Sequence, residues 1–223
     1  LDATGPDSVA PAVAPGQATL GFMLPYSPLH ILLLAGWDRP LVMTSGNLSD
    51  EPQCTDNREA GQRLAGLADA YLLHDREIVN RVDDSVVRVM AGAPRLLRRA
   101  RGYAPAPIPL PAGFADALPT LALGGELKNT ICLLKDGQAI LSQHLGDLEE
   151  ATTAMDYERT IGLYLDLYRH APRLLAVDRH PGYRSTQFGR DWAARDGLAL
   201  ADVQHHHAHI AVVLADNAWP LDG

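Results

Sequence analysis

The hydrophobic positions of residues 113–223 alternate between short apolar runs and longer stretches with a helical period. Short apolar runs bounded by turns are typical of buried strands, and the helical period is typical of helices that bury one face. We therefore predict strands within 120–125, 173–178 and 198–204, a hairpin within 130–145, and helices over 151–170, over 185–197 and from His205 onwards. The predicted order of elements is β-β-β-α-β-α-β-α.

Three details sharpen this prediction. Asp136-Gly137 separates two alternating strands, which is a strong signal for a type I′ hairpin turn. The helix over 151–170 should bury a stripe that consists of Tyr157, Ile161, Tyr164, Leu165 and Tyr168. In the final helix we expect Ile210, Val213 and Leu214 to face a core.

Residues 1–112 have a less regular pattern. The run "PLVMTSGN" (40–47) predicts a short buried strand that ends in a polar turn. Residues 57–74 predict an amphipathic helix whose apolar face consists of Ala60, Leu64, Leu67, Ala68 and Tyr71. Residues 84–102 predict two strands around a "GAP" turn.

A proline-rich stretch, "YAPAPIPLPAGFADALP" (103–119), marks the one shift in composition. Proline disfavours helices and interior strands, so we expect an extended linker. The sequence thus predicts an α/β protein with two domains, over residues 1–112 and 113–223. The order of elements in the second domain resembles half of an actin/sugar-kinase-like (ASKHA) ATPase fold, although a fold by itself does not give a function.

Composition narrows the function classes. The formal net charge of −8 argues against an electrostatic grip on nucleic acid. Apolar runs are too short to cross a bilayer, and the first residues lack the pattern of a secretory signal. Cys54 and Cys132 form no CxxC pair, which fits a reducing cytoplasm. The absence of an initiator Met indicates an internal segment of a longer protein.

Two candidate sites lie in the first domain. Ser45, Gly46 and Asn47 follow a predicted strand, where short polar side chains and backbone N–H groups suit a phosphate or a carboxylate. The alternative is an ordinary turn with Asx capping. Asp83 and Asp84 precede Ser85 and a strand, and paired acids can hold Mg²⁺ through water, or simply form a solvated turn.

Two more candidates lie in the second domain. Gly124 and Gly125 end a strand ahead of Lys128, Asn129 and Thr130, so that backbone can approach a phosphate and Lys128 can neutralise it. The spacing is not that of a P-loop, and an ordinary β-turn is the alternative.

The other candidate site of the second domain is a polar group at the end of another predicted strand. It consists of Asp178, His180, Tyr183, Arg184 and Ser185. Polar groups at the carboxyl ends of such strands are often functional, but Asp178 would also serve as a cap for the next helix.

The stretch "QHHHAH" opens the final helix. His205 and His209 stand at i and i+4 on one helical face, a spacing that allows both to bind one divalent metal ion. Packing and capping at the helix start, or acid–base chemistry, are the alternatives. Asp216 is a weak candidate for a third ligand.

Taken together, these motifs resemble the HypF-type carbamoyltransferases, which mature nickel–iron hydrogenases. The resemblance covers nearly the whole chain and rests on "MLPYSPLHILLL", "LVMTSGNLSDEP", "DREIVNRVDDSVVR", "LRRARGYAPAPI", "LALGGELKNTICLLKDGQAILSQHLGDLE", "VDRHPGYRST" and "VQHHHAHIA". It implies the C-terminal part of a YrdC-like twisted-sheet domain, followed by the first half of a TsaD-like ASKHA domain.

The resemblance also implies a reaction. Carbamoyl phosphate and ATP would give carbamoyl-adenylate, and the carbamoyl group would pass to the C-terminal cysteine of the partner HypE. The implied nucleotide-binding residues are Ser45, Asn47, Ser85, Arg99, Gly124, Gly125, Lys128 and Thr130. One of Arg98, Arg99 and Arg101 would contact phosphate, and the resemblance does not indicate which. His205 and His209 would hold Fe or Zn, with the remaining ligands beyond this chain.

The chain departs from the family pattern, because the acylphosphatase domain and its CxxC zinc fingers are absent. We therefore expect the segment alone to be inactive. Two alternative functions to carbamoyl transfer to HypE are carried out by proteins with the same two domain folds. They are threonylcarbamoyl-adenylate chemistry on tRNA and O-carbamoylation of a small molecule. The third alternative is a truncated product without activity. The acidic balance disfavours tRNA, and we expect neither nucleic acid nor membrane as a partner.

Overall fold

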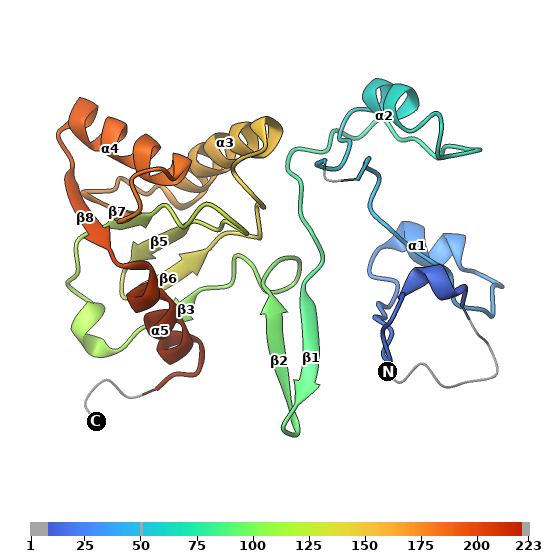
Figure 1. Ribbon diagram of the computed structural model, residues 1–223, viewed down its shortest axis with the longest axis horizontal. Helices are drawn as coiled ribbons and strands as arrows, with labels where there is room; N and C mark the ends of the chain where they lie inside the picture. Colours follow the sequence, from blue (N-terminus) through green and yellow to red (C-terminus); the bar gives the residue numbers. More distant parts are fainter. Residues whose placement is uncertain (1–8, 50, 220–223) are drawn as a thin grey trace. The chain divides into compact units, whose positions relative to one another are not determined.

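A computed structural model describes residues 9–49 and 51–219. Their contacts divide the chain into two compact units, Leu1–Ser45 and Gly46–Gly223. This division does not coincide with the expected boundary between residues 112 and 113, which stays a prediction. Each unit is described by itself below, with the elements labelled in Figure 1.

The first unit contains little regular structure in its described residues. A short 3-10 helix, η1, spans Pro11–Val13, and α1 spans Pro28–Leu33. Ser27 caps α1 by accepting a hydrogen bond from the His30 N–H at 3.2 Å, and Pro28 occupies the first turn, where its missing N–H costs nothing.

The buried strand expected within 40–47 is wrong. Residues 40–45 form no strand, and the side chains of Val42 and Met43 are 64% and 57% exposed. A strand is stabilised by hydrogen bonds to a neighbour and by burial of a face, and the described residues of this unit offer neither.

In the second unit, α2 spans only Asn57–Arg63 and begins at Asp56, whose carboxylate accepts hydrogen bonds from the backbone N–H groups of Arg58 and Glu59. The helix expected to reach residue 74 therefore ends early. Leu67 is 67% exposed and Tyr71 is 40% exposed, so the predicted apolar face buries little. Without that burial, helical propensity alone does not hold a long helix together, and Gly66 weakens it further.

The two strands expected within 84–102 are confirmed, but two residues of the expected "GAP" turn, Ala93 and Pro94, belong to the second strand. Strands β1 (Val86–Met90) and β2 (Ala93–Arg98) pair antiparallel. The turn falls at Ala91-Gly92, where both residues have positive φ values of 52° and 74°. Strands β1 and β2 form a sheet of their own. Among the described residues up to 112, the only other strand is the short β3, which belongs to a different sheet.

The proline-rich stretch is extended only in part: residues 103–105 lie in a turn, and residues 108–109 join the following sheet. Strand β3 (Ile108–Pro109) pairs antiparallel with β6, and a 3-10 helix, η2, follows over Ala112–Phe114. Proline is tolerated here because β3 is an edge strand, whose outward side needs no ladder hydrogen bonds.

The remaining elements appear in the predicted order β-β-β-α-β-α-β-α. They are β4 (Thr120–Ala122), β5 (Cys132–Lys135), β6 (Gln138–Leu141), α3 (Ala151–Tyr168), β7 (Leu174–Asp178), α4 (Arg184–Asp196), β8 (Ala199–Val203) and α5 (His205–Asp216). The sheet order is β3-β6-β5-β4-β7-β8, with β4, β7 and β8 parallel. Asp136 and Gly137 both have positive φ, as a type I′ turn requires.

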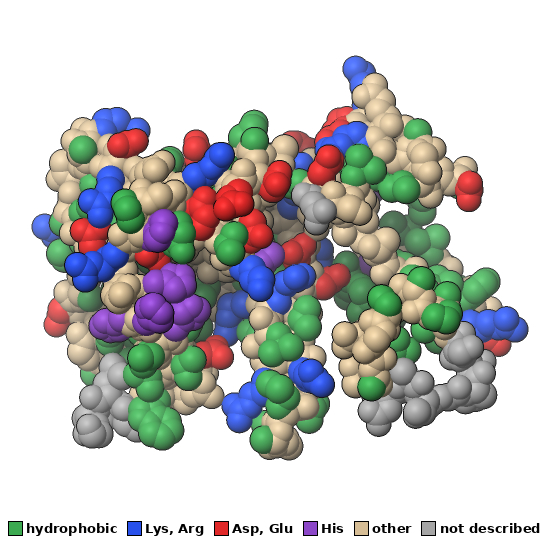
Figure 2. All heavy atoms as spheres, viewed as in Figure 1, with side chains coloured by type: hydrophobic (Ala, Val, Ile, Leu, Met, Phe, Trp, Pro, Cys, Tyr) green, Lys and Arg blue, Asp and Glu red, His purple; other side chains and the backbone are tan. Residues whose placement is uncertain are grey.

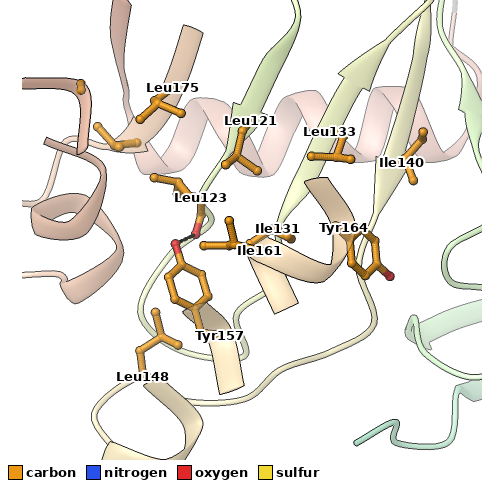
Figure 3. Close-up of a cluster of buried hydrophobic side chains, with 12 residues drawn as sticks. Leu121, Leu123, Ile131, Leu133, Ile140, Leu148, Tyr157, Ile161, Tyr164 and Leu175 are labelled. Carbon is orange, nitrogen blue, oxygen red and sulfur yellow. Dashed lines mark hydrogen bonds between the residues drawn. The ribbon is translucent and has the colours of Figure 1, made fainter. Parts of the chain in front are cut away.

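The core lies between this sheet and helices α3 and α4 (Figure 1). Leu121, Leu123, Leu133 and Leu175 are fully buried, and the predicted α3 stripe packs against them through Tyr157, Ile161 and Tyr164, as Figure 3 shows. Each such side chain contributes about 1.5–3 kcal/mol of hydrophobic stabilisation. The Tyr157 hydroxyl donates a hydrogen bond to the Leu123 carbonyl at 3.1 Å.

Helix α5 lies on the opposite side of the sheet (Figure 1) and has no buried residues. Ile210 and Val213 are 65% and 59% exposed, so the expectation that this stripe faces a core is wrong within the described residues. The reason is that the large side chains of the sheet point towards α3 and α4, which leaves small residues such as Ala122 and Ala176 under α5. No helix in residues 9–49 and 51–219 has the length and apolar character needed to span a membrane.

Candidate nucleotide and metal site

The carboxyl ends of β4, β7 and β8 meet at one edge of the sheet, because the three strands are parallel neighbours. Gly124 and Gly125 follow β4, Asp178 ends β7, and His205 begins α5 just after β8. A pocket of about 270 Å³ lies at this edge. Its lining includes Gly124, Gly125, Asp178, His205 and His209. The fold thus brings two separately predicted motifs, the glycine pair and the histidine pair, into one pocket.

The two histidines are arranged as the i, i+4 spacing predicts. Gln204 begins α5 by accepting a hydrogen bond from the His205 N–H through its side chain, and Figure 2 shows histidine side chains clustered over this helix. The Nε2 atoms of His205 and His209 lie 3.1 Å apart. Two nitrogens that bind one tetrahedral Zn²⁺ ion are separated by about 3.3–3.4 Å, so a shift of a few tenths of an ångström would let the pair share a divalent ion. Among the described residues, no group of three or more His, Cys, Asp or Glu side chains is arranged to hold a metal ion.

Asp178 orients one of these histidines. Its Oδ2 lies 2.6 Å from Nδ1 of His205, and its Oδ1 accepts a hydrogen bond from the His180 N–H at 2.9 Å. The alternative interpretation, a cap for the following helix, does not hold, since the first N–H of α4, that of Arg184, donates to the Glu126 carboxylate at 2.7 Å and not to Asp178. His180 stacks on Tyr183 with ring centroids 4.2 Å apart.

The turn after β4 requires glycine. Gly124 has φ +72°, and a Cβ there would lie 2.4 Å from the carbonyl oxygen of Thr130 and 2.7 Å from Nδ2 of Asn129. At Gly125 a Cβ would lie 3.7 Å from Cε1 of His205, so the turn passes directly beside the histidine. Backbone without side chains can therefore approach a ligand of this pocket closely.

Two side chains that pattern reasoning did not single out for this role hold the glycine turn. The Asn129 amide donates to the carbonyls of Leu123 and Gly125 at 3.0 and 2.6 Å, and the buried Ser185 hydroxyl donates to the Gly124 carbonyl at 3.1 Å. The Asn129 contacts are local to the turn, whereas Ser185 lies 61 residues from Gly124 and reaches it only through tertiary packing, which no spacing in the sequence indicates.

Lys128 and Thr130 do not line the pocket with the glycines. Lys128 has φ 50°, its backbone N–H donates to Asp147 at 2.6 Å, and it lines a second pocket of about 650 Å³. Thr130 is half-buried, and its carbonyl faces Gly124. A role in nucleotide binding stays a prediction for both residues.

Ser45 and Asn47 fall on either side of the division between the two units. Ser45 is exposed, whereas Asn47 is half-buried and donates to the Leu48 carbonyl at 2.8 Å. The Gly46 carbonyl accepts a hydrogen bond from the Cys54 N–H at 2.9 Å, which holds the turn against the next segment.

Ser85 and Arg99 already have protein partners. The Ser85 hydroxyl accepts from the Ala100 N–H at 2.8 Å and donates to the Arg101 carbonyl at 2.9 Å. The Arg99 guanidinium pairs with Asp216 on α5 at 2.8 Å. The Arg99–Asp216 pair joins the first expected domain to the second, and a nucleotide would have to compete with all of these contacts.

The carboxylates of Asp83 and Asp84 are likewise engaged. Asp83 contacts His144 Nδ1 at 2.9 Å and Gln53 Nε2 at 2.7 Å, with Arg98 at 3.7 Å, and Asp84 pairs with Arg101 at 3.3 Å. The hydrogen bond with His144 lowers the pKa of Asp83 more than burial raises it. The Mg²⁺ interpretation stays a prediction.

Comparisons with known proteins agree with these motifs. Residues 115–216 match the HypF Kae1-like domain family, and residues 2–100 match the Sua5/YciO/YrdC family, described as telomere recombination. Carbamoyltransferase HypF of Rhodobacter capsulatus is 50% identical over 216 residues, which cover 97% of this chain and 29% of the relative. Carbamoyltransferase HypF of Synechocystis sp. is 48% identical over 205 residues, which cover 92% and 26%.

Two solved structures resemble this chain over most of its length. A crystal structure of full-length HypF in the phosphate- and nucleotide-bound form superposes with a TM-score of 0.81 at 48% identity, covering 90% of this chain and 31% of that one. HypF of T. kodakarensis superposes with a TM-score of 0.85 at 35% identity, covering 96% and 28%. These matches confirm the expected fold class, a YrdC-like domain followed by an ASKHA-like domain. The chain, which spans about three-tenths of the length of these relatives, belongs to the HypF carbamoyltransferase family.

Proposed function

We propose that a full-length HypF containing this chain is an ATP-dependent carbamoyltransferase of hydrogenase maturation. Carbamoyl phosphate, water and ATP give carbamoyl-adenylate, inorganic phosphate and pyrophosphate: the bond from carbamoyl to phosphate is hydrolysed, and the carbamate oxygen then bonds to the α-phosphorus of ATP and displaces pyrophosphate. The thiolate sulfur of the C-terminal cysteine of HypE then bonds to the carbamoyl carbon, the bond between that carbon and the adenylate oxygen breaks, and AMP leaves.

One observation carries this proposal: the glycine turn after β4 and the histidine pair of α5 line the same pocket. A glycine turn lets backbone come close to phosphate oxygens, and two imidazoles at this spacing suit a divalent ion. A site for an adenylate in which phosphate and carbonyl oxygens must be held side by side needs both features. Family membership and the nucleotide-bound relative support the same assignment.

The residues of the chain have separate roles in this proposal. His205 and His209 hold a divalent ion, Fe or Zn, which acts when bound as a Lewis acid towards phosphate and carbonyl oxygens. Gly124 and Gly125 admit the phosphates, while Lys128 and Thr130 belong to the same phosphate hairpin. Ser45, Asn47, Ser85 and Arg99 contact the nucleotide where the adenylate is made, with Mg²⁺ accompanying ATP.

The test is ATP-dependent carbamoylation of a HypE tail peptide by the full-length protein, followed by mass spectrometry of the peptide. The double variant His205→Ala with His209→Ala should reduce the transfer rate at least about 100-fold, because it removes both metal donors. The matched control is His206→Ala with His207→Ala on the same turn, since both side chains are exposed and neither lines the pocket.

Equal transfer rates for the two double variants would refute the metal role. Transfer to tRNA or to a small-molecule hydroxyl, with none to the HypE peptide, would instead favour one of the alternative acceptors.

We infer a cytoplasmic enzyme that acts without nucleic acid, in line with the net charge of −8. The 223-residue chain alone should not turn over, because it spans a fraction of its relatives.

A further inference from the structure

We propose that Asp178 is a positioning residue for the metal site: its carboxylate fixes the tautomer and ring orientation of His205, so that Nε2 is the atom offered to the metal. This inference rests on the metal role assigned above and adds a residue to it. Asp178 does not bind the ion in this proposal; it acts through His205.

The carboxylate is held at two points. Oδ1 accepts the hydrogen bond from the His180 N–H at 2.9 Å, and Oδ2 lies 2.6 Å from Nδ1 of His205. Its side chain is only 8% exposed, whereas that of His205 is 44% exposed. Asp178 ends β7, a strand paired on both sides in the sheet, and its own carbonyl accepts a hydrogen bond from the Thr186 hydroxyl at 3.0 Å. The carboxylate is therefore a fixed part of the fold, and the imidazole must adapt to it.

This contact determines which ring nitrogen of His205 carries a proton. A carboxylate accepts hydrogen bonds, so Nδ1 of His205 must be the N–H donor, and in the neutral ring Nε2 keeps its lone pair. The Nε2 atom of His205, which carries this lone pair, lies 3.1 Å from Nε2 of His209. A metal-binding histidine commonly donates its second ring N–H to a carboxylate in this way, which raises the basicity of the ligating nitrogen.

The substitution Asp178→Asn separates this role from simple packing. An amide of the same shape has one oxygen, which can accept from the His180 N–H or from Nδ1 of His205 but not from both. If the amide NH₂ group faces the ring, it donates to Nδ1 and forces the proton onto Nε2, where it blocks the metal. If the oxygen faces the ring, the NH₂ group opposes the His180 N–H.

The experiment measures Zn²⁺ binding of metal-free full-length protein by competition with a chromogenic chelator, and the absorption spectrum of the Co²⁺ form. The double variant His205→Ala with His209→Ala serves as the blank for Zn²⁺ bound at the CxxC zinc fingers. Asp178→Asn should weaken Zn²⁺ binding about 10- to 100-fold and alter the Co²⁺ bands. The midpoint of thermal unfolding of the metal-free variant should stay close to that of the parent. The charge-matched control is Asp202→Asn on the neighbouring strand β8, where Asp202 pairs with Arg190 away from the pocket, and its affinity should stay within about twofold.

A second variant covers a loss of stability in Asp178→Asn. Asp178→Glu keeps an accepting carboxylate but moves it by one methylene, so its affinity should fall between those of the parent and of Asp178→Asn. Unchanged affinity in Asp178→Asn, together with lost binding in His205→Ala, would overturn the role of Asp178 and leave the metal site standing. Zn²⁺ binding and Co²⁺ bands that are the same in the parent and in His205→Ala with His209→Ala would overturn the metal site, and the role of Asp178 with it.

Discussion

Gly189 of α4 lies so close to Val177 of β7 that a Cβ on the glycine would fall 2.4 Å from the valine Cγ1 and 2.5 Å from Cδ1 of Leu123. Helix α4 therefore packs on the sheet at the distance that a missing side chain allows.

Gly189→Ala should destabilise the protein by about 1–3 kcal/mol, because the new methyl group overpacks the core. This cost outweighs the helical propensity that alanine adds, about 1 kcal/mol. The matched control is Gly162→Ala on α3, where nothing lies within 4 Å and the same propensity gain stands alone. Thermal unfolding of the two variants should shift in opposite directions, and a parallel shift would contradict the close packing.

Gly124→Ala should cost more than a glycine substitution at an equally left-handed position. Gly124 (φ +72°) and Gly197 (φ +67°) have nearly the same φ, but nothing lies within 4 Å of Gly197, whereas the Thr130 carbonyl would meet the new Cβ at Gly124. Gly197→Ala should lose about 1–2 kcal/mol, the cost of the left-handed conformation. Gly124→Ala should lose more, and nucleotide affinity should fall as the turn shifts. Equal affinities in calorimetric ATP titrations of the two variants would argue against a phosphate role for the turn.

Asp83→Asn should destabilise the protein by about 1–2 kcal/mol at neutral pH, because a charge-assisted contact with His144 is lost. The hydrogen bond lowers the folded-state pKa of Asp83 below 3.8, so this stability is fully present above about pH 4 and is lost as pH falls through the lower folded value. The unfolding midpoints of parent and variant should therefore converge only in acid. A difference that stays constant from pH 6 to about pH 3 would show that the contact is not ionic.

Tyr157→Phe should cost about 1 kcal/mol, because the substitution leaves the Leu123 carbonyl without the hydroxyl that reaches it at 3.1 Å. Burial raises the pKa of Tyr157 above its ordinary value, so the hydroxyl stays protonated and this cost should not vary between pH 6 and about pH 9. Chemical denaturation of the variant at several pH values checks both statements. A cost that disappears at pH 9 would contradict the buried hydrogen bond.

Much of the second half of this chain could be predicted from its sequence, because local signals and burial agree there. Asp136-Gly137 is the hairpin turn, the stripe through Tyr157, Ile161 and Tyr164 is the buried face of α3, and His205 and His209 share one helical face. In the first half, apolar periodicity misled at 40–47 and beyond Arg63, because such patterns form stable elements only where a partner surface covers them.

Local spacing by itself determined which residues are chemically suited to a site: a glycine pair after a strand, and two imidazoles one helical turn apart. Only the tertiary structure decided which of them meet. Parallel pairing of β4, β7 and β8 places Gly125, Asp178 and His205 around one pocket, while the left-handed turn at Lys128 directs that residue to another. Hydrogen bonds such as Asp178–His205 join residues 27 apart, and such a contact exists only once the sheet has formed.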